Sequence, residues 1–329
     1  MENGKIILID RGDYMYTFFP VIHNDELLFS IYARYHERSL SKNERQTLEK
    51  IGLTKLHPLL PESISRLTDE LGHFDAPNIE YFLNFHTLYN YFSNFISFNE
   101  KVEIYQYIFD GSGKVENYVL NKLFSRTPYL KYCPDCSKID FEILGESYWR
   151  VSHQPPTVFV CQIHHILLEQ LNVSNYEIGL KTVTLTETHI VSNRTLTKKT
   201  MFFAMRFLQQ SVYLNKLNLK LYNKTQSQDF YQLLKEKGFL INSEIDVKKL
   251  EREIIEFFGI EFLELVGFNQ GLFEEMANSP LFFSNSMAPI EILVFINFFF
   301  ESLSGIIIYH NKIPKRELVP SLLAEILMR

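Results

Sequence analysis

The stretch 131-KYCPDCSKIDFEILGESYWRVSHQPPTVFVCQIHH-165 contains all three cysteines of the 329-residue chain. Two residues separate Cys133 from Cys136. After twenty-four further residues, Cys161 and His164 have the same spacing. Two such pairs, each on a tight turn, can supply the four ligands of a tetrahedral zinc site. The spacing therefore predicts a zinc ribbon with one Zn²⁺. Because four protein ligands leave no position for water, its expected role is structural.

Three alternatives accompany this prediction. His165 could replace His164 as the fourth ligand, although only His164 gives the same spacing in both pairs. The cysteines could be buried and inert. The Cys-x-x-Cys pair could be a redox motif, but no thioredoxin-like βαβ pattern surrounds it.

Composition and charge narrow the class of protein. Hydrophobic residues make up 46% and charged residues 22%, with only 13 glycines and 12 prolines, which favours a helical globular chain. The N-terminus lacks the pattern of a signal peptide. The apolar run 290–310 is interrupted by Glu291, Asn297 and Glu301, which indicates a buried helix rather than a membrane span. With an odd number of cysteines, we expect a cytoplasmic protein whose thiols are reduced.

The hydrophobic pattern predicts a mainly α fold. We expect a helical N-terminal region at 1–125, a zinc ribbon with short β-hairpins at 126–175, and a helical C-terminal region at 176–329. In the ribbon, the segments 141-FEIL-144 and 157-TVFV-160 have the composition of strands. Expected helices, with their starts and ends from capping signals, cover 24–39, 62–71, 78–109 (two helices), 197–218, 227–238, 246–259, 288–303 and 317–329.

The C-terminal region has a basic segment. Residues 198–250 contain ten basic and four acidic side chains, a net charge of +6 in a chain of −6. Two helices at 227–238 and 246–259 fit a helix-turn-helix, although seven residues make a long turn. A DNA-binding surface is one interpretation and a solvated lysine-rich face is the other. The candidate DNA contacts are Lys198, Lys199, Arg206, Lys235, Lys237, Lys248 and Lys249.

Nothing in the chain indicates an enzyme. It contains no Walker loop, no GxSxG motif and no carboxylate cluster typical of a nuclease. His86 and His153 lie near aromatic residues, and we interpret them as core histidines rather than ligands or bases.

The ribbon resembles a known family. The runs Tyr132–Cys136, Gly145–Trp149 and Cys161–Leu168 are similar to the three signature elements of the TnsD/TniQ family of transposition target selectors, in the same order and at similar intervals. A weaker similarity upstream involves Pro20, Asp25, Glu26, Leu27, Ser30, Ala33 and Arg34. The chain departs from the family at His23–Asn24. It is also shorter than the sequence-specific selectors, as expected of a short member or of a truncated chain.

The resemblance implies a function without bond chemistry. Such proteins select the insertion site of a TnsABC-type transposase by engaging target DNA, or a DNA-bound CRISPR effector, and recruit the AAA+ regulator TnsC. One alternative is a guide-dependent subunit of a CRISPR Cascade complex with its guide RNA, without sequence-specific DNA binding of its own. More distant alternatives are a zinc-dependent nucleic-acid enzyme and a purely structural subunit that forms a homodimer.

Overall fold

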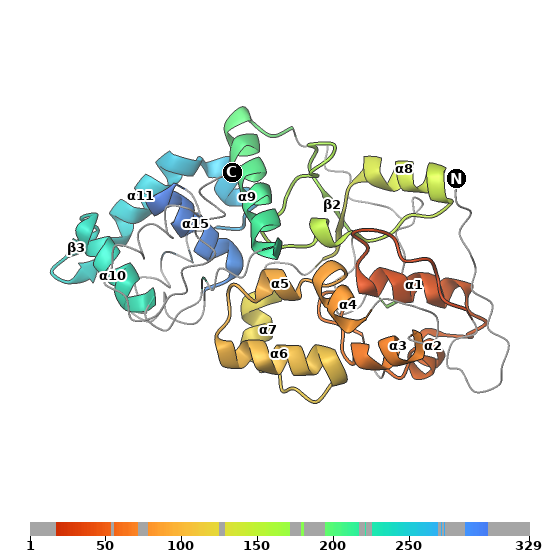
Figure 1. Ribbon diagram of the computed structural model, residues 1–329. Helices are drawn as coiled ribbons and strands as arrows, with labels where there is room; N and C mark the ends of the chain where they lie inside the picture. The colour runs from red at the N-terminus through yellow and green to blue at the C-terminus, as the bar shows by residue number, and fades with distance from the viewer. Residues whose placement is uncertain are drawn as a thin grey trace, which may run out of the picture.

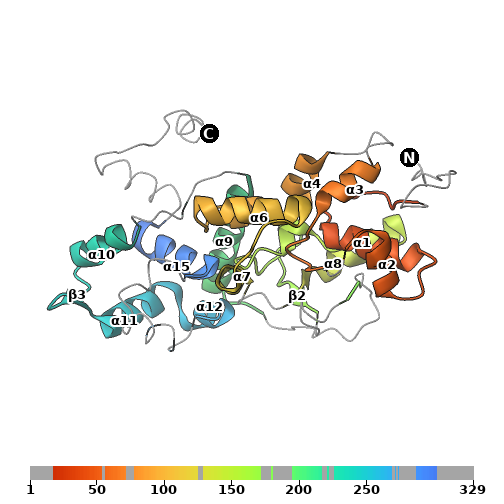
Figure 2. The same cartoon turned by 90° about the horizontal axis from the view of Figure 1, so that it is seen from below.

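The computed structural model describes residues 18–53, 56–71, 78–124, 129–171, 179–180, 195–216, 221, 226–268, 271, 273 and 287–301. Within these ranges the protein is mostly helical, with two pairs of two-residue antiparallel strands. It is elongated, with the N-terminal helices and the cysteine segment at one end and the C-terminal helices at the other (Figures 1 and 2). The long helix α9, Lys198–Lys216, lies between them.

The N-terminal region is a cluster of short helices. They are α1 (Leu28–Arg38), α2 (Glu44–Lys50), α3 (Ile64–Leu71), α4 (Ile79–Phe85), α5 (Tyr89–Phe92), α6 (Phe98–Asp110) and α7 (Asn117–Phe124). Local signals explain the limits of α6, because Ser97 and Glu100 form a capping box and Gly111 ends the helix at φ 80°. The expected pair of helices over 78–109 is wrong in number, since α4, α5 and α6 share that range.

The expected start of the first helix at Asn24 is wrong. Helix α1 begins at Leu28, after Leu27 as N-cap, and Asp25 adopts φ 62°. Asp25 and Glu26 do not form a first helical turn, because their side chains and backbone bond to distant residues instead, as described below. The local pattern resembled a helix start, but tertiary contacts use the same acidic side chains.

The cysteine segment lies between two paired strands. Strand β1 (Lys131–Tyr132) pairs antiparallel with β2 (Glu169–Gln170), and α8 (Pro134–Leu144) and a 3₁₀ turn (Val151–His153) lie between them in sequence. The expectation of a strand at 141–144 is wrong, because these residues form the last turn of α8. Proline at N1 and Gly145 at the left-handed C-cap define that helix and override the β-branched composition.

The C-terminal region is packed around phenylalanines. Its elements after α9 are α10 (Gln226–Glu236), β3 (Leu240–Ile241), β4 (Glu244–Ile245), α11 (Val247–Phe258), α12 (Ile260–Leu265) and α15 (Pro289–Phe300). The rings of Phe203, Phe207, Phe258 and Phe262 contact one another at centroid distances of 4.7–6.3 Å. They join α9, α11 and α12 into one core.

Helix α15 contains the described part of the apolar run at 290–310, and it is buried as expected. Within α15, the polar residues that interrupt the run have defined partners. Asn297 exchanges two hydrogen bonds with Gln210 of α9, at 2.9 and 2.8 Å, and Glu291 accepts from the Ala288 amide at 2.8 Å. None of the helices in the described ranges combines the length and hydropathy that a bilayer-spanning segment requires. The expected helix at 317–329 lies outside the described residues.

Candidate metal centre and basic surface

The first cysteine pair lies at the start of a helix. Strand β1 leads into Cys133, which is the N-cap of α8, and Cys136 follows in the first turn. The free amide groups and the dipole at a helix N-terminus favour negative charge, so this position stabilises thiolates. Both sulfur-bearing side chains are buried.

The second pair lies on a tight turn. The Cys161 amide donates to the Ile166 carbonyl at 2.8 Å, and the His165 amide donates back to the Cys161 carbonyl at 3.0 Å. Inside this turn the amides of Ile163 and His164 point at the Cys161 sulfur, at 3.4 and 3.5 Å. His165 adopts φ 55°, which reverses the chain and leaves its side chain exposed. The turn therefore turns Cys161 and His164, rather than His165, towards the first pair.

The four side chains meet with the dimensions of a metal site. The Sγ atoms of Cys136 and Cys161 are 3.7 Å apart, and His164 Nδ1 lies 3.3, 3.4 and 3.7 Å from the sulfurs of Cys133, Cys136 and Cys161. A tetrahedral zinc ion with its usual bond lengths requires edges of about 3.8 Å between two sulfurs and about 3.6 Å between sulfur and nitrogen. A disulfide would need about 2.05 Å. These residues could hold one metal ion.

An apolar layer surrounds the cluster. Its buried side chains come from two separate regions, with Val158, Val160 and Leu168 from the cysteine segment and Ala204 and Leu208 from α9. Ala204 is 0% exposed, so α9 closes this side of the site. The metal-site region and the C-terminal helices thus share one packed surface.

A buried charged cluster fixes α1 to the cysteine segment. Arg34 Nη1 donates to both carboxylate oxygens of Glu26, at 3.0 and 2.8 Å, and its Nη2 donates to Glu146 at 2.6 Å. Arg34 is 1% and Glu26 0% exposed. Arg38 also bonds Glu146, and His23 Nε2 lies 3.5 Å from it. Burial opposes ionisation of Glu146, but the hydrogen bonds from His23 and Arg34 outweigh it and lower the pKa of this carboxyl.

Backbone and side-chain bonds extend this contact. The Leu27 amide donates to the Trp149 carbonyl at 2.7 Å, and Ser30 Oγ accepts from the Trp149 amide at 3.1 Å. Asp25 accepts from the amide and hydroxyl of Ser152, at 2.9 and 2.5 Å. Burial raises the pKa of Asp25, although both Ser152 bonds oppose that shift. Asp25, Leu27 and Ser30, which belong to the similarity upstream of the ribbon, thus hydrogen-bond to the ribbon.

The two candidate histidines outside the cluster are core residues. His86 is 0% exposed, and its Nδ1 lies 2.5 Å from the Glu26 carbonyl oxygen. Burial lowers the pKa of His86. His153 is 4% exposed and lies in the 3₁₀ turn. Neither belongs to the group of possible metal ligands among the described residues.

The seven candidate DNA contacts do not form one surface of equivalent cations. Lys199 Nζ donates to the Glu256 carbonyl at 2.8 Å, and Lys249 Nζ donates to the Gly238 carbonyl at 2.9 Å. Both therefore bond backbone carbonyls near helix ends. Lys235, Lys237 and Lys248 are exposed on the α10–α11 unit, whereas Lys198 and Arg206 line a groove on α9.

The α10–α11 unit differs from a simple helix-turn-helix. Strands β3 and β4 form a hairpin between the helices, with Asn242 and Ser243 at φ 52° and 67° in its two-residue turn. The basic segment 198–250 stops inside α11 and so omits its acidic residues. The whole helix carries Lys248, Lys249 and Arg252 against Glu251, Glu253 and Glu256. The net charge of α11 is therefore zero. Arg252, which lies beyond the segment 198–250 and is not among the seven candidate contacts, is the arginine of this helix.

Comparison with known proteins identifies the N-terminal half. Residues 17–168 match the model of the TniQ family. No curated protein matches the chain. The match runs from the residue before the first described segment to the end of the second cysteine turn, so α9 to α15 lie outside it.

Proposed function

We propose that this chain, which belongs to the TniQ/TnsD family through its TniQ domain at residues 17–168, is a target-selection adaptor of a TnsABC-type transposon. It binds target DNA, or a DNA-bound CRISPR effector, and recruits the AAA+ regulator TnsC. The family match carries the proposal. The adaptor itself makes and breaks no bonds.

The metal in this proposal is one structural Zn²⁺, held by Cys133, Cys136, Cys161 and His164. Three thiolates and an imidazole are donors that zinc prefers, and the distances between them suit tetrahedral coordination. When bound, the ion supplies folding free energy. Four protein donors leave no open position, which argues against the zinc-dependent enzyme.

The DNA-facing side is the α10–α11 unit. Lys235, Lys237 and Lys248 are exposed there and would contact phosphates, which position a protein on a duplex without reading its sequence. Lys199 and Lys249 support this unit through the carbonyls they bond. The proposed domains are the N-terminal region 1–125, the zinc ribbon 126–175 and the C-terminal region 176–329. Helix α9 connects the ribbon to the remaining C-terminal helices.

The protein-facing side is the exposed face of α8. Ile139 and Ile143 lie one turn apart on this face and are 42% and 74% exposed, while Asp140 of the same helix is buried against Arg150 at 2.7 Å. Large apolar side chains that are exposed on a helix are suited to a protein partner. We assign this α8 face to the regulator.

A substitution on this face tests the assignment. Ile143→Glu should abolish co-purification with TnsC and transposition, because a buried charge at an interface is costly. The metal content and the melting temperature should stay unchanged, since Ile143 is 74% exposed. The control is Leu40→Glu, at a position that is 98% exposed. Equal effects of both variants would refute the α8 assignment.

A guide-dependent subunit of a Cascade complex is the second candidate. The observation that favours it is the zero net charge of α11, which is a poor basis for independent duplex recognition. A gel shift on the attachment site without any guide complex separates the two. Specific binding of the protein to the attachment site excludes the guide-dependent form. No binding to this DNA, together with binding to the effector complex, supports the guide-dependent form. Light scattering of the purified protein tests the homodimer.

A further inference from the structure

Helix α9 carries a face of exposed and half-buried side chains that the proposed function does not use. At 100° per residue, six side chains lie within about 80° of one another around the helix axis. These side chains, here called the α9 face, are Lys198, Phe202, Arg206, Gln209, Tyr213 and Lys216. Phe202 and Tyr213 are each 59% exposed. Two exposed aromatic rings on one face of a helix are candidates for ligand contact.

The charge of α9 has one sign. Its 19 residues include Lys198, Lys199, Arg206 and Lys216 and no acidic residue. The carboxylate of Glu261 lies near the start of the helix, where it accepts hydrogen bonds from Thr197 and Thr200. It is therefore already engaged in capping α9. The α9 face is cationic, in contrast to the balanced charge of α11.

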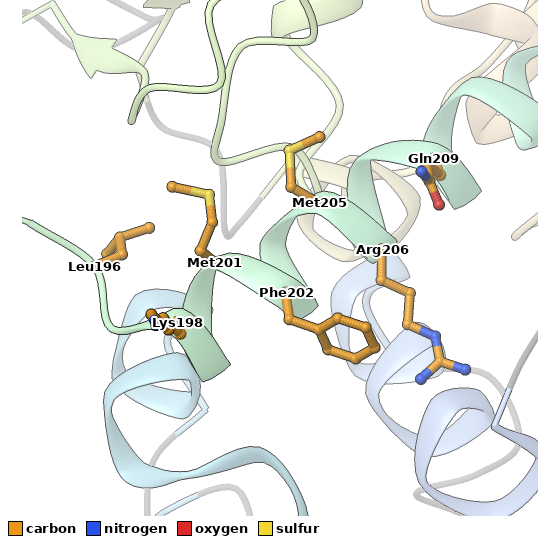
Figure 3. A pocket seen from close by; sticks show the side chains of 7 residues that line it. All are labelled: Leu196, Lys198, Met201, Phe202, Met205, Arg206 and Gln209. Carbon is orange, nitrogen blue, oxygen red and sulfur yellow. The ribbon is translucent and has the colours of Figure 1, made fainter.

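A groove of about 680 Å³ runs beside this face. Figure 3 shows the seven lining side chains, with Met201 and Met205 directed to one side of α9 and Phe202 and Arg206 to the other. Met201 and Met205 also pack on the apolar layer of the metal cluster. The Arg206 guanidinium lies 5.8 Å from the Phe202 ring centroid. The groove is thus lined by apolar side chains, an exposed aromatic ring and two cations.

These features fit an unpaired strand better than a duplex. A duplex hides the flat faces of its bases, whereas a single strand can stack them on exposed aromatic rings while cations contact its phosphates. The α9 face is about 27 Å long from Lys198 to Lys216, at 1.5 Å per residue. With one phosphate per about 3.4 Å of a stacked strand, it could contact about eight nucleotides.

We propose that the α9 face binds single-stranded DNA, with bases stacked on Phe202 and Tyr213 and phosphates on Lys198, Arg206 and Lys216. The inference rests on the proposed function, in which the chain acts at target DNA. It adds a second nucleic-acid surface, outside the TniQ domain and separate from the α10–α11 unit. That surface would hold a strand that has been opened from the duplex.

Fluorescence anisotropy with a labelled oligothymidine of about twelve nucleotides tests the proposal on the whole 329-residue chain. Phe202→Ala and Tyr213→Ala should each weaken binding by about 5- to 150-fold, the range that loss of one base stack predicts. The aromatic control is Phe98→Ala, on α6, where the side chain is 76% exposed. It should bind like the wild type. Circular dichroism checks the fold of each variant.

Two further measurements separate this surface from the duplex surface. Lys235→Ala combined with Lys248→Ala should weaken duplex binding and leave oligothymidine binding within about twofold, since these residues lie off the α9 face. Unchanged oligothymidine binding in the Phe202 and Tyr213 variants would overturn the inference. Tighter binding of oligouridine than of oligothymidine, or full displacement of the strand by an acidic peptide, would also overturn it. If the wild-type protein bound oligothymidine but selected no insertion site in a transposition assay, the proposed function alone would be refuted.

Discussion

The two halves of the molecule are held together by different chemistry. In the TniQ domain, the segments are joined by buried polar contacts such as Glu26–Arg34–Glu146 and by a cluster of possible metal ligands. In the C-terminal half, phenylalanine rings fill the interface between helices. Polar networks require defined geometry, whereas apolar cores tolerate changes of shape. We therefore expect the first half to depend on individual atoms and the second on total buried volume.

Removal of a metal ligand should have the largest effect. Cys161→Ser should abolish the binding of stoichiometric zinc and destabilise the TniQ domain by several kcal/mol. The reason is that structural zinc contributes about 10 kcal/mol or more to the folding of small domains. Elemental analysis and thermal unfolding measure both quantities. Ile163→Ser, on the same turn but 66% exposed, is the control and should keep its zinc. Retention of zinc by the Cys161 variant would remove the main difference between the halves.

Loss of the buried cation should come next. Arg34→Met leaves Glu26 buried without its partner and should cost about 3–5 kcal/mol of unfolding free energy in urea titrations. The matched control is Arg45→Met, which removes an ion pair to Glu49 from a side chain that is 88% exposed. That change should cost no more than about 0.5 kcal/mol. Similar losses in both variants would contradict the role given to burial.

A change of shape in the C-terminal core should cost less. Phe207 is fully buried against Phe258 and Phe262, and Phe207→Leu keeps most of its apolar volume. We expect a loss of about 1–2 kcal/mol, compared with about 3–5 kcal/mol for Phe207→Ala, which leaves a cavity. Urea unfolding of the two variants gives the ratio. An equal loss would mean that this core is as intolerant as the polar network.

Acid should act selectively on the TniQ domain. The pKa of Glu146 is lowered in the folded protein from its ordinary 4.5, so the unfolded chain takes up the proton first as the pH falls. The stabilisation from Glu146 is complete above about pH 4.5 and is lost as the pH falls towards the folded pKa. The melting temperatures of wild type and Glu146→Gln should therefore converge in acid. The exposed Glu142→Gln should follow the wild type throughout, and a constant gap for Glu146→Gln would refute the linkage.

Some features could be read from short segments of sequence. The spacing of Cys133, Cys136, Cys161 and His164 was sufficient to predict which side chains would gather, because each pair lies within one turn. Mainly helical structure followed from apolar periodicity, and the end of α6 followed from Gly111. These signals act over a few residues, so the sequence contains them directly.

Other features depended on residues far apart in the chain. Asp25 and Glu26 resemble the first turn of a helix, but their partners Ser152 and Arg34 decide their conformation. The segment at 141–144 has strand composition, yet it continues the helix that begins at Pro134. Folding selected the long-range bonds because buried carboxylates need partners more than a helix needs a preferred cap.

The sequence alone determined the group of possible metal ligands and the helical class, since both arise from local spacing. Only the tertiary structure decided the roles of the basic residues. It placed Lys199 and Lys249 on backbone carbonyls, left Lys235, Lys237 and Lys248 exposed, and put Lys198 and Arg206 beside a groove. Net charge counts side chains along the chain, whereas binding depends on which of them remain free at one surface, and that depends on packing.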